Sequence, residues 1–302
     1  MTATGTRPLP MTWGRVTALV IGVPVALALI GLLSLSIVAD LAPVRVSIDR
    51  TVALKEATAG VAVDDPDLTL NASHTAHRQI VVRGTLTGSF TQPVVDLRTT
   101  ATGVAVNSRC VVPTGDCSGA LDVTVPAGLP VLASDGNGNL NASDLHGQVT
   151  LSDGSGNLTA TGLSGTISMS DGAGDIFAAG LSGRSIKIGD SSGNLNAAGV
   201  SGSTVALSDS AGDISVSDLA ATDVTGRAGS GNITVAFTAV PRRVDVVDSA
   251  GNITLILPRG PAYYEVSTQI VDGNTSVSVR RSASSPYVID ASTDSGNITI
   301  QY

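Results

Sequence analysis

The second half of the chain repeats one pattern of apolar and polar positions every 18–20 residues as far as Gly251. A Gly-Asn or Gly-Asp pair marks each unit, and its glycine is, in order, Gly138, Gly156, Gly174, Gly193, Gly212, Gly231, Gly251 and Gly296. After Gly156, for example, Leu158 and Ala160 are apolar and alternate with Thr159 and Thr161. Alternate residues of a strand share one face of a sheet. The pattern therefore predicts a strand whose apolar residues point inward.

Each unit also predicts a second strand. In the same unit, Leu163 is followed by Gly165, where the chain must bend, and then by Ile167 and Met169 at alternate positions. A unit thus consists of strand, corner, strand and corner, and a fixed period of this length is typical of a solenoid. One unit cannot be stable alone, so neighbouring units must stack and share hydrogen bonds and a core. We expect an all-β fold, a parallel β-helix, over residues 131–302, with loosened coils or a cap at the C-terminal end.

A membrane segment precedes this region. Residues 16–39 carry no charge, and at about 1.5 Å per residue a helix of this length crosses a hydrocarbon core of about 30 Å. Arg7 and Arg15 precede the segment, so the positive-inside rule places residues 1–15 in the cytoplasm and the rest of the chain outside. A cleaved signal peptide is the alternative, although its apolar region should be shorter. We expect one uncleaved transmembrane α-helix, followed by irregular, extracytoplasmic β structure over residues 40–130.

Composition agrees with an all-β chain. Glycine is abundant, at 34 residues, and aromatic residues make up only 3%, which suits a protein with many turns. The net charge of −8 comes from residues 131–302, which hold eight Lys and Arg against sixteen Asp and Glu. Such an acidic region argues against binding to nucleic acid or to anionic lipid, because both need a basic face.

Cys110 and Cys117 are the two cysteines of the chain. The segment between them, VVPTGD, contains Pro and Gly and favours a turn. Two cysteines this close can form a small hairpin disulfide in an oxidising compartment, which agrees with an extracytoplasmic location. Two unpaired thiols are the alternative. A metal site is disfavoured, since no His or further Cys lies nearby.

Aspartate recurs at one corner of five consecutive units. This row consists of Asp135, Asp153, Asp171, Asp190 and Asp209. Four residues later comes a second polar row, Asn139, Asn157, Asp175, Asn194 and Asp213. Stacked carboxylates repel one another by roughly 1 kcal/mol per pair in water, which is tolerable at a solvated edge, so we expect the aspartates at such an edge.

Two explanations of the aspartates stay open. Asp and Asn form hydrogen bonds with the backbone of turns, which favours a structural role. A ladder of Ca²⁺ sites is the alternative, because Ca²⁺ binds several oxygen ligands. The sequence does not match the nine-residue pattern of calcium-binding β-rolls, and the segment that begins at Asp135 lacks the glycine of an EF-hand loop. We expect no cofactor, with Ca²⁺ as the alternative.

The order of the segments resembles a known family. An N-terminal membrane segment, irregular β structure, the strand LDVTVPAG at residues 121–128 and tandem SGN(I/L)xV units follow one another. This order resembles the bacterial putative-adhesin family of membrane-anchored β-helical domains, over about residues 44–302. The resemblance implies a right-handed parallel β-helix at the cell surface. The molecular function of that family is itself largely unassigned, so the resemblance implies little about ligands.

The sequence contains no recognisable acid pair, catalytic triad or metal cluster, so we expect that the protein is not an enzyme. A carbohydrate-active β-helical enzyme is one alternative, although residues 134–226 contain only Arg184 and Lys187 as basic side chains. A membrane signalling partner is another. We expect a membrane-anchored, extracytoplasmic β-solenoid with a structural, adhesion-like or interaction role. Its partners would be the membrane, through residues 16–39, and an extracellular glycan or protein.

Three tyrosines stand close to the C-terminus, namely Tyr263, Tyr264 and Tyr287. Packing in the core and cap is the favoured interpretation, because the neighbouring segments are apolar. A patch on which carbohydrate stacks is the alternative.

Overall fold

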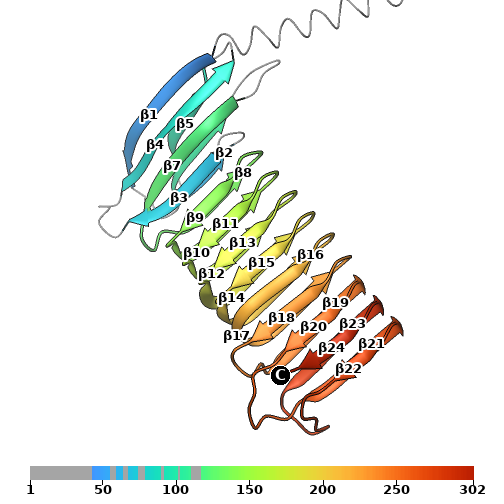
Figure 1. The fold of residues 1–302 in the computed structure, drawn as a ribbon. Coiled ribbons are helices and arrows are strands. Elements are labelled where there is room, and N and C mark those ends of the chain that lie inside the picture. Colours follow the sequence, from blue (N-terminus) through green and yellow to red (C-terminus); the bar gives the residue numbers. More distant parts are fainter. Residues whose placement is uncertain are drawn as a thin grey trace, which may run out of the picture.

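The computed structural model describes residues 43–54, 59–63, 67–73, 79–89, 92–100, 103–109 and 117–302. These residues form 24 β-strands, which stack into an elongated body (Figure 1). The predicted cytoplasmic tail, residues 1–15, and the predicted transmembrane helix, residues 16–39, lie outside the described residues. Within the described part of the chain, no helix has the length and apolar character that a membrane span requires.

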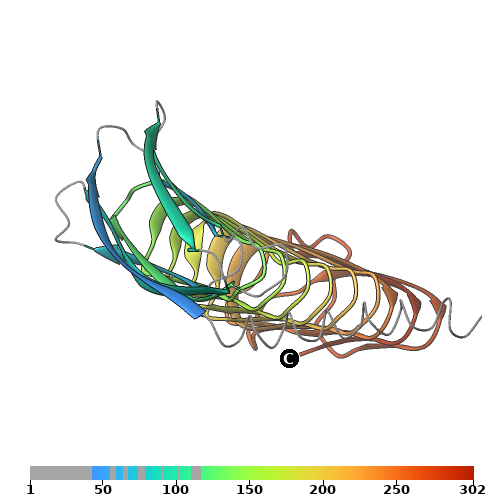
Figure 2. The same cartoon turned by 90° about the horizontal axis from the view of Figure 1, so that it is seen from above.

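The central coils each give one strand to each of two sheets. In sheet A lie β9 (Leu140–Ser143), β11 (Leu158–Thr161), β13 (Ile176–Ala179), β15 (Leu195–Ala198), β18 (Ile233–Phe237) and β20 (Ile253–Ile256). In sheet B lie β8 (Val131–Asp135), β10 (His146–Asp153), β12 (Ser164–Ser170), β14 (Ser182–Asp190), β16 (Ser201–Asp209) and β19 (Arg243–Ala250). One long strand, β17 (Ile214–Ala228), runs through a corner and pairs in both sheets. Figure 2 shows the coils following one another along the stack.

Neighbouring coils pair in parallel, with equivalent residues opposite each other. Leu158 pairs with Leu140 in one neighbouring coil and with Ile176 in the other. All three side chains are buried, and the alanines two residues further on are buried with them. Each coil therefore completes the core of the next one. The parallel stacking confirms the all-β solenoid that the repeat predicts.

The N-terminal end departs from this plan. Its strands are β1 (Pro43–Ala53), β2 (Ala59–Val63), β3 (Asp67–Ser73), β4 (Gln79–Ser89), β5 (Val94–Thr100), β6 (Gly103–Arg109) and β7 (Cys117–Pro126). The pairs β1–β4, β4–β7 and β5–β6 are antiparallel. The coil of β2 and β3 lies between the coil of β6 and β7 and that of β8 and β9, with parallel pairing on both sides. Parallel stacking thus begins well before residue 131.

The C-terminal coils also stack out of chain order. Their strands are β21 (Glu265–Asp272), β22 (Thr275–Val277), β23 (Val288–Ser295) and β24 (Ile298–Gln301). Strand β23 lies between β19 and β21, and β24 lies between β20 and β22 (Figure 1). The last coil of the sequence is therefore inserted into the stack, and the coil of β21 and β22 ends it.

Candidate functional site

The five predicted aspartates stack in one row, where the strands of sheet B end. Asp153 pairs with Asp135 in the preceding coil, and Asp190 pairs with Asp209. All five residues are buried, with only 4–5% of their surface exposed. The expectation of a solvated edge is therefore wrong. The reason is strand alternation, because each aspartate follows a buried apolar residue by two positions, as Asp153 follows Leu151, and so points to the inner face.

The row has a sixth aspartate that the sequence analysis missed. Asp248 is 1% exposed and occupies the equivalent position in β19. Ala228 stands between Asp209 and Asp248, and Thr293 follows Asp248. The interruption and the wider spacing of the later coils hide this member from a search by period. We call Asp135, Asp153, Asp171, Asp190, Asp209 and Asp248 the aspartate row.

The two carboxyl oxygens have different surroundings in every member of the row except Asp153, whose Oδ1 and Oδ2 both lack a partner among the described residues. Oδ1 of Asp135 accepts a hydrogen bond from the backbone N–H of Gly138 at 3.2 Å, and Oδ1 of Asp209 accepts one from Ala211 at 3.0 Å. Oδ2 has no hydrogen-bond partner among the described residues in any member of the aspartate row. A buried charged oxygen without a partner is unfavourable. The inner corner therefore favours the neutral carboxylic acid.

Burial raises the pKa of all six carboxyl groups. For Asp171 the pKa rises to about 6, first because of burial and then because of the negative charges of Asp153 and Asp190. The pKa values of Asp153 and Asp209 rise to about 6 for the same two reasons. Like charges at this spacing oppose the ionisation of one another. The row thus titrates closer to neutral pH than exposed aspartates do.

The described residues contain no group of three or more His, Cys, Asp and Glu side chains that could hold a metal ion. The members of the aspartate row follow one another singly, one from each coil that carries them. A ladder of Ca²⁺ sites stays a prediction.

The second polar row forms a hydrogen-bonded ladder on the outside of the coils. The backbone N–H of Asn157 donates to Oδ1 of Asn139 at 3.0 Å, and that of Asp175 donates to Oδ1 of Asn157 at 3.0 Å. The same contact joins successive coils from Asp67 to Asn274. These side chains bond to the backbone of the neighbouring coil, so they hold the coils together.

The predicted disulfide falls partly outside the described residues. Cys117 is the first residue of β7, and Cys110 belongs to the part of the chain that is not described. The pairing of the two cysteines stays a prediction.

The outer face of sheet A carries an exposed aromatic residue that the sequence analysis did not single out as a site. Phe177 in β13 is 43% exposed. Small side chains of neighbouring strands, among them Thr161, Asn196 and Ala198, surround it in a shallow hollow of about 330 Å³. Alternation predicts that Phe177 points outward, but only the pairing of the coils shows which side chains surround it. An exposed ring among small polar groups provides a contact surface for a ligand.

Parallel coils with two sheets and a continuous apolar core define this protein as a β-solenoid. Residues 112–301, more than half of the chain, match the family model described as Toastrack DUF4097, so the chain belongs to this family. The match confirms the family resemblance drawn from the sequence motifs.

Two solved structures are similar to the chain. A putative adhesin from Bacteroides fragilis is 13% identical, with a TM-score of 0.48, and the match covers 85% of this chain and 97% of the adhesin. A putative cell adhesion protein from Clostridium sporogenes is 9% identical, with a TM-score of 0.23, over 85% of this chain and 99% of that protein. Similarity this low supports no conclusion about function. No curated protein matches the chain.

Proposed function

We propose that residues 16–39 anchor this protein in the cell membrane and that a right-handed β-solenoid projects from the outer surface, with a structural, adhesion-like or interaction role. The uncharged segment and the arginines before it support the anchor and its orientation. Strand β1 begins at Pro43, shortly after the segment. The β1 end would then lie near the membrane, with the coil of β21 and β22 at the far end of the elongated body (Figure 1).

The observation that carries an interaction role is the outer face around Phe177. A ring that is 43% exposed leaves apolar surface in water, and a bound partner would cover it. Thr161 and Asn196 beside it provide polar groups for hydrogen bonds. The acidic charge of the solenoid argues against nucleic acid as the partner. An extracellular glycan or protein fits this surface better.

The proposal is tested on intact cells. A membrane-impermeant label should react with residues of the solenoid while the membrane is intact. Cells that carry the protein should also bind one or more members of a panel of glycans and matrix proteins. Phe177→Ala should weaken that binding, whereas Val271→Ala, at an exposed position outside the hollow, should not. A solenoid that is protected from the label in intact cells would overturn the proposed location. Equal binding by both variants would exclude the face around Phe177 as the surface that binds the partner.

We also propose that the protein has no catalytic activity and acts by binding. Cleavage of a polysaccharide by the purified protein would contradict this and would favour the alternative of a carbohydrate-active enzyme. Recovery of one dedicated histidine kinase or transporter with the protein from membranes would favour the alternative of a signalling partner.

Calcium binding is tested by thermal unfolding. A ladder of Ca²⁺ ions on the aspartate row would neutralise the carboxylates and bind only the folded chain, so millimolar Ca²⁺ should raise the melting temperature by several degrees relative to chelator. The matched variant Asp171→Asn should reduce this rise. An unchanged melting temperature would exclude calcium from the row.

A further inference from the structure

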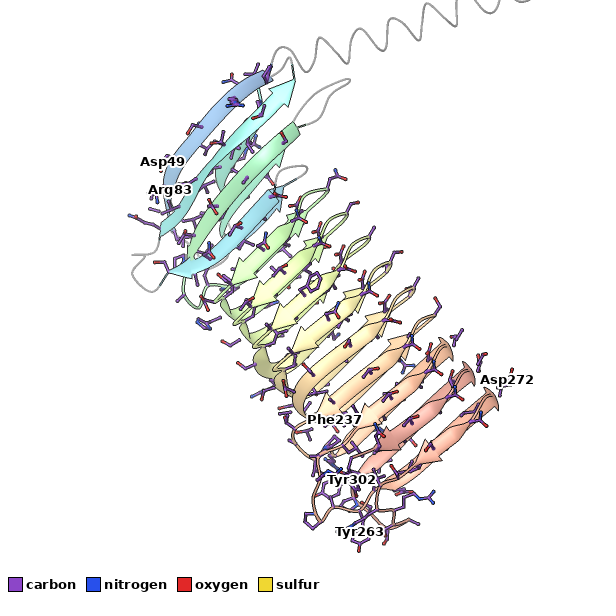
Figure 3. The ribbon with its side chains drawn as sticks, viewed as in Figure 1. Asp49, Arg83, Phe237, Tyr263, Asp272 and Tyr302 are labelled. Carbon is purple, nitrogen blue, oxygen red and sulfur yellow. The ribbon has the colours of Figure 1, made fainter. Side chains whose placement is uncertain are left out.

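A hollow of about 480 Å³ lies at the end of the solenoid opposite β1. Two loops form it, one between β20 and β21 and the other between β22 and β23. The residues that line it include Tyr263, Arg281, Ser282, Ser285, Pro286 and Tyr287. We call this site the tip hollow. Figure 3 shows Tyr263 projecting from the loops at this end. A volume of this size is in the range of small-molecule sites, which hold about 300–1,000 Å³.

Hydrogen bonds of the backbone and of one side chain tie the two loops together. The N–H of Ser282 donates to the carbonyl oxygen of Tyr264 at 2.9 Å, and Oγ of Ser285 donates to the carbonyl oxygen of Tyr263 at 2.6 Å. Arg281 forms a β-bridge with Tyr264. The walls of the hollow are thus fixed before any ligand arrives, which reduces the entropy cost of binding.

A buried tyrosine supports the aromatic wall. Tyr264 is fully buried, and its ring centroid lies 6.2 Å from that of Tyr287 at an interplanar angle of 54°. This tilted contact is a favourable arrangement of two rings. Tyr263 next to it is 53% exposed. The cap packing predicted for the tyrosines therefore describes Tyr264, whereas Tyr263 presents its side chain to solvent.

The tip hollow also carries positive charge in an acidic region. Arg281 is exposed, and no ion pair found among the described residues includes it. Arg259 and Arg280 belong to the same two loops, and the carbonyl oxygen of Arg280 accepts a hydrogen bond from the N–H of Tyr264 at 2.8 Å. Arg280 and Arg281 are neighbours in the chain, and Arg259 belongs to the other of the two loops. A guanidinium group without a carboxylate partner is suited to bind an external carboxylate.

We propose that the tip hollow binds an acidic saccharide, that is, a sugar ring that bears a carboxylate. The exposed ring of Tyr263 and that of Tyr287 would pack against the apolar face of the sugar. Arg281 would donate hydrogen bonds to the carboxylate, and the hydroxyl group of Ser282 would bond to a sugar hydroxyl. The hydroxyl oxygen of Ser285, whose hydrogen already bonds to Tyr263, would accept a hydrogen bond from another. The inference rests on the proposed function only for the source of the saccharide, which is outside the cell. The affinity of the hollow itself does not depend on that location.

The experiment uses the full chain in lipid nanodiscs and isothermal titration calorimetry. The acidic probes are tetragalacturonate and sialyllactose, and the neutral controls are maltotetraose and lactose. We expect binding of an acidic probe, none of the neutral controls, and weaker binding at high salt, because the charges are exposed. Arg281→Gln should weaken binding about tenfold or more, which corresponds to about 1.4 kcal/mol. Arg184→Gln, at an exposed position in β14, is the matched control and should change nothing.

The aromatic wall is tested separately. Tyr263→Ala should weaken binding about tenfold, and Tyr263→Phe should retain most of it, because the ring and not the hydroxyl provides the contact. The side chains of Tyr263 and Arg281 are exposed, so unchanged melting temperatures should show that the variants of both residues fold. Failure of both acidic probes to bind, or equal affinity for neutral and acidic probes, would overturn the proposal.

The outcomes separate this inference from the proposed function. Suppose that Arg281→Gln loses acidic-saccharide binding but no impermeant label reaches the solenoid in intact cells. The tip hollow is then supported as a saccharide site, and the surface location is refuted. If the label reaches the solenoid in intact cells but neither acidic probe binds, the surface location is supported and the saccharide site is refuted.

Discussion

At the scale of single residues, the aspartate row is the most unusual feature of this protein. Carboxyl groups are seldom buried without partners, because desolvation disfavours their charged form. Here one buried carboxyl group stands in each of five consecutive coils. Four of them use one oxygen to hold a turn, and Oδ2 of all five has no partner among the described residues. The stability of the solenoid should therefore depend on the protonation of this row.

We predict that the protein is more stable at about pH 4.5 than at about pH 7.5. The pKa of Asp171 is about 6 in the folded protein, compared with an ordinary value of 3.8. Between these two values the folded chain retains a proton that the unfolded chain has lost, so stability falls as the pH rises through this window. The melting temperature should decrease by several degrees across it, as measured by circular dichroism, and change little above about pH 7.5.

The variant Asp171→Asn tests the cause of this pH dependence. The amide has nearly the same shape and no charge, so the variant should be more stable than the natural protein at about pH 7.5, by about 1–2 kcal/mol, and less dependent on pH. Asp218→Asn, at an exposed position in β17, is the control and should leave the profile unchanged. If Asp171→Asn lowers stability at neutral pH instead, the carboxylate has a favourable partner, and bound calcium becomes the better explanation.

The inward orientation of the aspartates can be predicted from the sequence. The sequence shows that the residues recur, and alternation counted from Leu151 or Ile188 places the following aspartate on the inner face. The chemistry of the side chain suggested a solvated position instead. Local geometry prevailed over side-chain polarity because the strand continues through the aspartate before the corner begins.

At the scale of the elements, contact between successive corners limits the choice of residue. A Cβ atom on Gly174 would lie 1.5 Å from the carbonyl oxygen of Gly156, and one on Gly212 would lie 1.5 Å from that of Gly193. Backbone therefore packs directly on backbone at this corner. From Gly156 onward, the glycine of each Gly-Asn or Gly-Asp pair is needed for the stacking of coils.

We predict that Gly174→Ala destabilises the protein by about 3 kcal/mol or more, because the added methyl group must push two coils apart. Gly260→Ala is the matched control, since no heavy atom lies within 4 Å of its new Cβ. Urea unfolding followed by circular dichroism measures both. Equal midpoints for the two variants would show that the corners are less tightly packed than the structure indicates.

The strands of the central coils follow from the sequence, with one exception. Four units have a glycine at the second corner, at Gly147, Gly165, Gly183 and Gly202, and the equivalent position of the next unit is Ala221. There the chain continues as the single long strand β17. The absence of glycine at this corner can be read from the sequence. Whether the strand then continues through the corner depends on pairing with the neighbouring coils.

At the scale of the whole molecule, the two ends of the solenoid follow rules that differ from those of the middle. In the middle, each coil stacks on the preceding one. At the C-terminal end, the coil of β23 and β24 is inserted between two earlier coils, and at the N-terminal end the coil of β2 and β3 stacks directly on that of β8 and β9. The inserted coil thus pairs residues that lie far apart in the sequence.

Engineered disulfides test the C-terminal order. Val247 in β19 pairs with Ser292 in β23, so Val247→Cys with Ser292→Cys should form a disulfide, detected by mass spectrometry of peptides. Gln269 in β21 pairs with the other side of Ser292. Val247→Cys with Gln269→Cys spans two coils, about 10 Å, and should stay reduced. The opposite result would mean that the coils stack in chain order.

The sequence by itself determined the repeating unit, the inward rows of apolar residues and the parallel stacking, because all three follow from a period that local alternation and glycine corners make visible. The tertiary structure decided the order of the coils at both ends, the burial of Asp248 and the tip hollow. These depend on pairing between segments such as β20 and β24, whose residues are 45 positions apart. No local pattern encodes such a pairing, because its free energy arises only when distant strands share hydrogen bonds and a core.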